Sequence, residues 1–325
     1  MKHKIKIYNL LMVMFFTSLT CTAESADTPE RFISLRAEDA PIERPWERGA
    51  TIAYSSVNGK SAAIIDAEFN IAYNNPVSKV DGVLKKGVVT STPAIGAYWH
   101  RNTGSSAPRD DRGISFLYLG SYFPDSASGA VQAFGWSAQA KFGSSLAAVE
   151  DTNDQTTNVR SNRQIVRGTY YLQPMIKGIP IAGRPAPITF FGTDLGLYSD
   201  HIGGGNSGAL SGRISGVLGK VSASYAPFGL VAQESSVGGG ILGFVPILVV
   251  SAQVQRDFNA SGERLRETRK LYDISLNLSF GPRSLSGISQ VLVPSLTISR
   301  TIGSDALIGQ YRRQAMTNIA LSFLF

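Results

Sequence analysis

Residues 272–280, Tyr-Asp-Ile-Ser-Leu-Asn-Leu-Ser-Phe, alternate strictly between apolar and polar side chains. Successive side chains of a β-strand point to opposite faces, so this pattern predicts a strand with a different environment on each side. The same alternation recurs at 63–73, 134–142 and 217–225. A pattern repeated this often along one chain predicts a sheet in which every strand separates two solvents.

The predicted strands are long. Several run for roughly 10 to 14 residues, whereas strands of soluble proteins cluster near about 5 to 6. A tilted strand that crosses a bilayer needs about 9 to 11 residues, so the lengths favour a membrane protein. We predict about twelve strands, at residues 49–56, 62–74, 87–101, 113–123, 131–143, 164–177, 187–199, 213–226, 241–256, 270–281, 289–301 and 314–325.

The N-terminus has the layout of a secretory signal peptide. A basic start, residues 1–6, precedes the apolar run 10–19, and small residues follow up to Ala23. The alternative, a transmembrane helix, needs about 20 residues. Cys21 lacks the leucine three positions before it that a lipoprotein cleavage site requires. We therefore predict a signal peptide over 1–23.

The remaining chain is mildly basic and has low charge. Only 17% of residues are charged, against about 25% in soluble domains. Three of the basic residues fall in the signal segment, and no dense Lys/Arg stripe remains, so we expect no nucleic-acid partner. Residues 24–48 contain prolines and lack alternation, which predicts a periplasmic N-terminal extension or a short plug. This segment is a candidate docking site for a periplasmic partner.

The last nine residues carry a more specific motif. Ile319, Leu321, Phe323 and Phe325 share one face of a predicted strand, and phenylalanine ends the sequence. The segment resembles the C-terminal strand of Gram-negative outer-membrane β-barrel proteins. That resemblance implies that these four residues form a membrane-assembly signal, read by the barrel-assembly machinery.

These features together predict an all-β fold, an antiparallel transmembrane β-barrel of about 12 strands over 49–325, located in the cell outer membrane. No predicted segment after the signal could span as an apolar helix, and lipid tolerates only helices and closed barrels. The expected partners are outer-membrane lipids and lipopolysaccharide. A soluble all-β periplasmic protein is the alternative, and it does not explain the strand lengths.

Polar stretches separate the predicted strands. With a periplasmic N-terminus, residues 101–112, 149–163 and 257–269 fall on the outside, and shorter connections fall inside, as is usual in outer-membrane barrels. The stretch 238–250 is apolar without alternation. It is either a strand buried on both faces or an apolar segment folded into the lumen.

A set of polar strand residues is predicted to line the lumen. In a pore for small solutes they set which solutes pass, and in a closed barrel they pair and fill the interior. We predict a pore or channel, with a non-enzymatic envelope scaffold or surface-binding barrel as the alternative. The candidates are Asp66, Glu68, Asn70, Gln139, Lys141, Arg167, Asp194, Lys220 and Asp273.

An enzymatic role has little support in the sequence. A lipid hydrolase would use a pair such as His201 and Ser207, but outer-membrane lipid hydrolases have a His and a Ser two residues apart, and these are six apart. We expect no catalytic residues and no cofactor. We also expect no dedicated metal site, although Asp110 and Asp111 offer oxygens for loosely held Ca²⁺.

Overall fold

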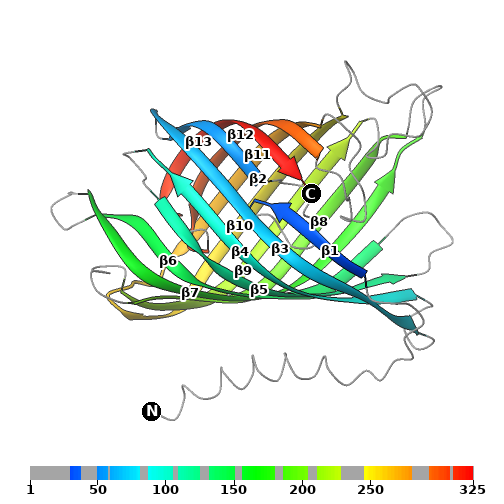
Figure 1. Cartoon of the computed structure of the whole chain (residues 1–325), viewed down its shortest axis with the longest axis horizontal. Coiled ribbons are helices and arrows are strands. Elements are labelled where there is room, and N and C mark those ends of the chain that lie inside the picture. The colour runs from blue at the N-terminus through cyan, green and yellow to red at the C-terminus, as the bar shows by residue number, and fades with distance from the viewer. Residues whose placement is uncertain are drawn as a thin grey trace, which may run out of the picture.

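The computed structural model of the chain is a barrel of strands (Figure 1). No helix in the described part of the chain is long and apolar enough to cross a membrane. The structure describes residues 30–37, 50–57, 59–80, 87–104, 109–124, 132–150, 156–179, 186–203, 211–227, 245–279, 293–307 and 310–324.

Thirteen strands follow one another along these residues. Twelve of them correspond one to one with the strands predicted from the alternation. Their bounds are β1 (Glu30–Arg36), β2 (Ala50–Val57), β3 (Lys60–Val80), β4 (Gly87–Asn102), β5 (Arg109–Pro124), β6 (Gln132–Glu150), β7 (Thr156–Lys177), β8 (Ile188–Gly203), β9 (Gly212–Ala226), β10 (Val245–Gly262), β11 (Thr268–Ser279), β12 (Val293–Asp305) and β13 (Gln310–Leu324).

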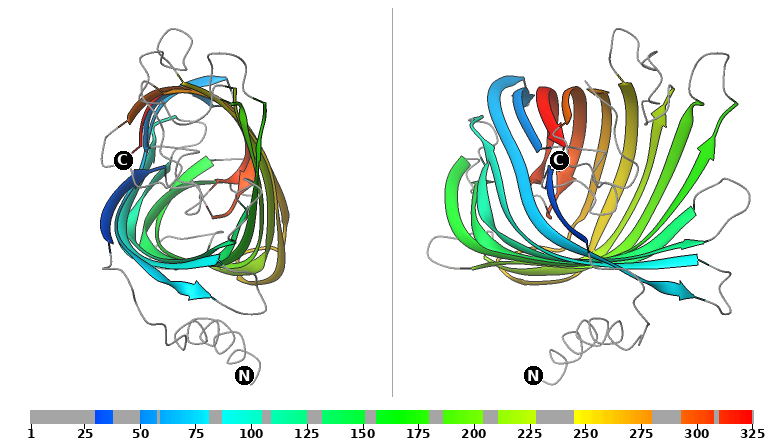
Figure 2. Two further views of the ribbon diagram at one scale, coloured as in Figure 1. Left: turned by 90° about the vertical axis from the view of Figure 1, so that its right-hand side faces the viewer. Right: turned by 45° about the vertical axis from the view of Figure 1, so that its right-hand side comes forward.

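The sheet closes on itself. Each strand from β2 to β13 pairs antiparallel with the next, and β13 pairs with β2 from Met316↔Val57 to Phe323↔Ala50. Figures 1 and 2 show the resulting ring. The predicted antiparallel barrel of twelve strands is confirmed. Closure matters because it leaves no exposed strand edge around the ring.

The additional strand β1 lies in the wall as well. It pairs with β3 from Glu30↔Asn74 to Arg36↔Glu68. β2 pairs with the next part of the same edge of β3, beginning at Thr51↔Asp66. Part of the segment 24–48, which the sequence suggested as an extension or plug, is therefore strand. The signal segment 1–23 and residues 38–49 lie outside the described residues.

Burial in this barrel is the reverse of that in a soluble protein. On β11, Tyr272 and Ile274 are exposed on the outer face, while Ser275, Asn277 and Ser279 are buried toward the lumen. The other strands repeat this division, with large apolar side chains outside and polar ones inside. The two environments that the alternation predicted are thus the outer surface and the lumen.

For the apolar stretch 238–250, the structure describes residues from 245 onward as strand β10, so the strand alternative holds there. β10 is apolar on both faces at its start, since Leu248 and Val250 are exposed, while Ile247 and Val249 pack inside against Ile188, Phe190 and Ala226. The expected contrast in connection length is wrong. Strands continue into the polar stretches predicted as long outer loops, and the widest gaps between strands, 227–244 and 280–292, lie at the other end.

We call the end of the barrel that holds the β2–β3, β4–β5 and β12–β13 connections the turn end. One connection there bends into the barrel. The ladder between β12 and β13 shifts register between Gly303 and Asp305, and Gly303 has φ +138°. A Cβ on Gly303 would come within 1.9 Å of the Lys270 carbonyl oxygen, so only glycine fits this bend. Figure 2 shows the end of β12 inside the ring.

The closure of the ring can be tested by cross-linking. Ser55 and Asn318 face each other across the β2–β13 ladder and are hydrogen-bonded. Opposed strand residues are within reach of a disulfide. We expect Ser55→Cys with Asn318→Cys to form one readily, in a chain lacking residues 1–23, which hold the only natural cysteine. Non-reducing gel mobility reports the bond.

The control pair is Ser55→Cys with Ser322→Cys. Ser322 pairs with Thr51, four residues along β2, which places the two sulfurs about 13 Å apart along the strand. Equal cross-linking of both pairs would contradict the register, and no cross-linking of the first pair would contradict closure.

Candidate functional site

The lumen is the candidate site, and the structure places all nine predicted residues on its surface. Every one lies at an inward position of its strand. Arg167, Lys220 and Asp273 are half-buried, and the other six are buried. Both signs of charge are present, so the lumen has the composition of a wet or ion-paired interior rather than of an apolar core. Whether they line a path for solutes stays a prediction.

Glu68 on β3 is the centre of a buried ion cluster. Its two carboxylate oxygens lie 3.1 Å from Arg36 of β1 and 3.1 Å from Lys141 of β6. Ser115 of β5 donates a hydrogen bond at 2.8 Å. The Lys141 ammonium also lies 4.9 Å from the centre of the Tyr98 ring. The cluster ties β1, β3, β5 and β6 together from inside.

Six of the remaining predicted residues face neighbours on adjoining strands, whereas both polar side-chain atoms of Asn70 are buried without a hydrogen-bond partner among the described residues. Asp66 lies 3.6 Å from His100, and Asp273 accepts a hydrogen bond from Thr301 at 2.6 Å. The backbone registers place Asp194 opposite Lys220 and Gln139 opposite Arg167. Opposite charges at directly facing strand positions stabilise a sheet, and here they also neutralise the lumen locally.

A second ion cluster lies near the turn end. Arg163 of β7 is its central residue, because its guanidinium lies 2.9 Å from Asp200 on β8 and 3.4 Å from Asp111 on β5. Asp111 is also 2.5 Å from Arg109, and Asp200 is 2.9 Å from Arg264 in the β10–β11 connection. All five side chains are almost fully buried.

The same arginine holds the β12–β13 turn. The Nη2 of Arg163 donates to the carbonyl oxygen of Ala306, and the amide of Ala306 donates to Gln255 at 3.0 Å. Asp305 accepts hydrogen bonds from Gln255 and from Gln253, the latter at 2.6 Å. Every backbone polar group that the turn brings into the lumen needs such a partner.

Apolar contacts anchor the tip of the turn. Ala306 and Leu307 are buried in one cluster with residues of β7, β8 and β9, which lie three to five strands away from β12 around the ring. The turn therefore lies across the lumen and narrows it. The cluster partners are Ile165, Tyr198, Ile214 and Leu218.

A third buried group sits beside the turn. The hydroxyl of Tyr198 donates a hydrogen bond to Asp257 of β10, and Arg269 of β11 lies 2.7 Å from the same carboxylate. Asp257 also accepts the amide of Glu267 at 3.0 Å. These contacts fix the β10–β11 connection, which the sequence reading treated as a free outer loop.

Sequence reasoning missed the whole turn-end network. Arg163 and Asp111 fell in stretches predicted as outer loops, and Arg36 fell in the predicted extension. The inward alternation of β7 does continue through Ser161, Arg163 and Ile165, so extending the period-two pattern by a few residues would have placed Arg163 in the lumen.

The structure describes three of the four side chains considered for other chemistry. Ser207 lies outside the described residues, and His201 is half-buried on the outer face with its Nδ1 3.1 Å from the Gly212 carbonyl. Asp110 points outward to Arg160 at 3.5 Å, whereas Asp111 points into the lumen. Their carboxylates face opposite sides of β5 and do not share a cation.

The predicted assembly motif lies on β13 next to the closing seam. Ile319 and Leu321 are exposed on the outer face, opposite Tyr54 and Ile52 of β2. Phe323 pairs with Ala50 through its backbone, and Phe325 lies outside the described residues. Its reading by an assembly machinery stays a prediction.

Comparison with known proteins gives matches among solved structures alone. Neither a protein-family model nor a curated protein matches the sequence. The β domain of the Bordetella autotransporter BrkA is similar with a TM-score of 0.42 and 8% identity, over 91% of this chain and 100% of that one.

Two further autotransporter structures are similar. The translocator domain of NalP from Neisseria meningitidis has a TM-score of 0.38 and 10% identity, over 99% of this chain and 98% of that one. The transport unit of AIDA-I from Escherichia coli has a TM-score of 0.38 and 8% identity, over 97% of each chain.

The role of Arg163 predicts a large cost for its removal. Arg163→Gln removes one of the two arginines beside each of Asp200 and Asp111 and releases the Ala306 carbonyl. We expect the free energy of unfolding to fall by about 3 kcal/mol, as for loss of one partner of a buried ion pair. Urea titration in lipid vesicles, followed by tryptophan fluorescence, measures it.

Arg160→Gln is the matched control on the same strand. Arg160 points outward, is half exposed, and pairs with Asp110 at 3.5 Å, so its loss should cost only about 0–1 kcal/mol. Similar costs for the two variants would show that the turn-end network contributes nothing beyond a surface pair.

Proposed function

We propose that this chain is a non-catalytic outer-membrane barrel whose polar lumen passes small solutes, narrowed at the turn end by the β12–β13 turn. One observation carries the proposal. Large apolar side chains are exposed all around the outside, while charged side chains of both signs are buried within. A barrel with an apolar exterior and a polar interior is suited to lipid outside and water inside.

The outer wall supports the membrane location. Exposed apolar residues recur around the ring, where they would face lipid, as Phe116 on β5, Phe191 and Leu195 on β8, and Ile319 on β13 illustrate. Exposing this much contiguous apolar surface to water is rare in soluble proteins. The ring also pairs the backbone groups of all twelve strands, which lipid requires.

The lumen supports the pore. Lys141, Glu68 and Asp66 project into it from β6 and β3, which are not among the strands that anchor the turn. A solute moving along the axis would meet paired charges of both signs, which predicts a narrow path with modest ion preference.

A scaffold or surface-binding barrel is the second candidate function. The specific observation in its favour is the turn itself, because Ala306 and Leu307 occupy the lumen and are held by Arg163. In that case the ion clusters serve to stiffen the wall. A partner at the periplasmic side and lipopolysaccharide at the surface are the interactions we propose for it.

The membrane location can be tested by measuring how much a lysine destabilises the barrel at two positions on its outer face. Ile319 and Ser56 both face outward, and Ile319 lies within the apolar belt, whereas Ser56 lies in a polar row next to the β2–β3 turn. A lysine costs about 2–4 kcal/mol at the midplane of a bilayer and about 0–1 kcal/mol near its edge.

We therefore expect Ile319→Lys, inside the apolar belt, to lower the free energy of unfolding in lipid vesicles by more than Ser56→Lys, whose cost should be about 0–1 kcal/mol. Urea titration with a heat-modifiable gel shift as readout measures both. Equal costs would argue against an outer face embedded in lipid.

The pore can be tested through ion preference. Lys141→Glu places a second carboxylate beside Glu68, so we expect the reversal potential under a KCl gradient to shift toward cation preference. Single channels in planar bilayers give the measurement. Arg101→Glu, an exposed outward position on β4, makes the same change of charge outside the lumen and should leave the potential unchanged.

The outcomes separate the two functions. A shift in Lys141→Glu alone supports a path past Glu68. Open channels with no shift would mean that solutes take another route, and a folded barrel without any channel activity would favour the scaffold.

A further inference from the structure

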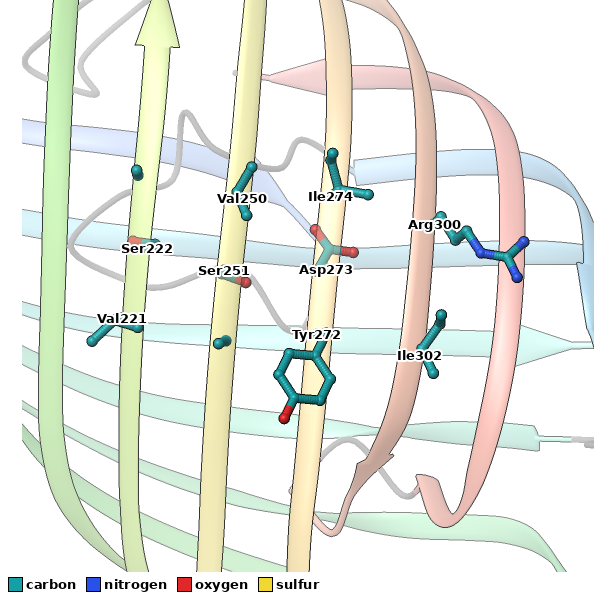
Figure 3. Close-up of a pocket in the computed structure, with 11 residues that line it drawn as sticks. Val221, Ser222, Val250, Ser251, Tyr272, Asp273, Ile274, Arg300 and Ile302 are labelled. Carbon is teal, nitrogen blue, oxygen red and sulfur yellow. The ribbon is translucent and has the colours of Figure 1, made fainter.

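The outer wall of the barrel carries a hollow. A depression of about 450 Å³ lies on the outside of β9, β10, β11 and β12. Its outward-facing lining includes Ala223, Val250, Ala252, Tyr272, Ile274 and Arg300. Figure 3 shows these strands side by side, with the tyrosine ring and the isoleucine and valine side chains around the hollow.

Small side chains on the middle strands create the hollow. Ala252 of β10 sits between Val221 and Tyr272, and Ala223 of β9 faces Val250. Each alanine leaves space where neighbouring positions carry larger groups. A lipid-facing hollow with apolar walls fits a hydrocarbon chain, because such a chain gains contacts there that a smooth wall does not offer.

Arg300 is a cation at the rim of this apolar surface. It is exposed, and its guanidinium donates a hydrogen bond to the neutral Thr317 hydroxyl at 2.9 Å. Within the described part of the chain it forms no ion pair. Figure 3 shows its side chain extending away from the hollow, over β13.

The neighbouring ladder shows where Arg300 lies relative to the apolar belt. Arg300 pairs with Thr317, and Thr317 with Ser56 beside the β2–β3 turn, which makes a row of outward polar residues. The next outward row, toward the opposite end, is Ile298, Ile319 and Tyr54. Arg300 therefore lies at the lateral edge of the apolar surface, beside this polar row, while Ile302 and Tyr272 continue the apolar surface one row nearer the turn end. A cation at this edge is close to the level of lipid headgroups in the proposed location.

Two more exposed cations flank the hollow on its other side. Lys270 is the next outward residue after Tyr272 toward the turn end of β11, and Arg256 is its diagonal neighbour on β10. The nearby carboxylates of Asp257 and Glu267 are both engaged by Arg269. The rim thus offers two separate groups of cations, Arg300 on one side and Lys270 with Arg256 on the other.

We propose that this hollow is a binding site for the lipid A part of lipopolysaccharide, with an acyl chain in the depression and its phosphates on the flanking cations. Lipid A carries two phosphates on one headgroup, which matches cations on two sides of one hollow. Arginine and lysine bind phosphate through charge-assisted hydrogen bonds. The inference rests on the outer-membrane location proposed above, with the N-terminus in the periplasm, which puts the turn end in the outer leaflet, where lipid A lies.

The test uses the chain without residues 1–23, refolded in neutral detergent and titrated with bisphosphorylated lipid A, with bound lipid counted by native mass spectrometry. We expect saturable binding that weakens about tenfold in Arg300→Gln, the effect of losing one charge-assisted contact. Ala252→Leu fills the hollow and should weaken binding without removing charge. Arg101→Gln, an outward arginine on the far wall, should bind like the unmodified chain.

Titrations with two other lipids test whether the bound lipid is lipid A. Dephosphorylated lipid A and phosphatidylglycerol should each bind at least about tenfold more weakly, since one lacks both phosphates and the other carries a single one. Equal affinity for phosphatidylglycerol would overturn the assignment to lipid A. Binding that Arg300→Gln and Ala252→Leu both leave unchanged would overturn the site itself.

Failure of the site and of the location are distinguishable. A chain that inserts into vesicles and shows heat-modifiable mobility, but binds lipid A equally well in every variant, refutes the lipid site alone. A chain that does not insert refutes the membrane location, and the lipid site with it.

Discussion

The pairing of β13 with β2 is the contact on which the rest of the structure depends. Without it the sheet would end in two long edges of unpaired backbone groups, which lipid does not tolerate and water would expose to aggregation. With it, eight facing residue pairs from Met316↔Val57 to Phe323↔Ala50 complete the ring. Closure also gives the sheet a face toward the lumen and a face toward the outside. The polar positions of the alternating sequence then face the lumen.

Because the polar face of the sheet is enclosed by the ring, many of its charged side chains are buried. Removing ionised groups from water is costly unless each is paired and hydrogen-bonded. Glu68 meets Arg36 and Lys141, and Asp200 meets Arg163 and Arg264. These pairs join strands that are not all neighbours along the chain, so the interior charges brace the ring while lining its lumen.

The β12–β13 turn enters the lumen and narrows it. Gly303 permits a bend that other residues would block, Arg163 and Gln255 bond its backbone, and Leu307 packs on the far wall. Because these side-chain contacts lie outside the strand ladders, the turn can be displaced without breaking the backbone pairing of the ring. That property suits a narrow pore, and it equally suits a plugged scaffold.

Much of this fold followed from the sequence because period-two alternation is a local signal. Residues 272–280 and the other alternating stretches fixed the face of each side chain, so Asp66, Lys141 and Asp273 were placed inward correctly. The turn-end network was missed because Asp111, Arg163 and Arg264 lie in polar stretches, where a strand extension and a loop have the same composition. The partners of Arg36 and the bend at Gly303 depend on contacts between distant segments, which no local pattern encodes.

The most direct test of the account compares single-channel conductance of the refolded chain with that of Leu307→Asp in planar bilayers. A carboxylate at this position cannot stay in the apolar cluster of Ile165, Tyr198 and Ile214, so the turn should leave the lumen. The account predicts small, steady openings for the unmodified chain and a several-fold larger conductance for the variant. A correctly folded barrel that stays silent in both forms would contradict a solute path through the lumen.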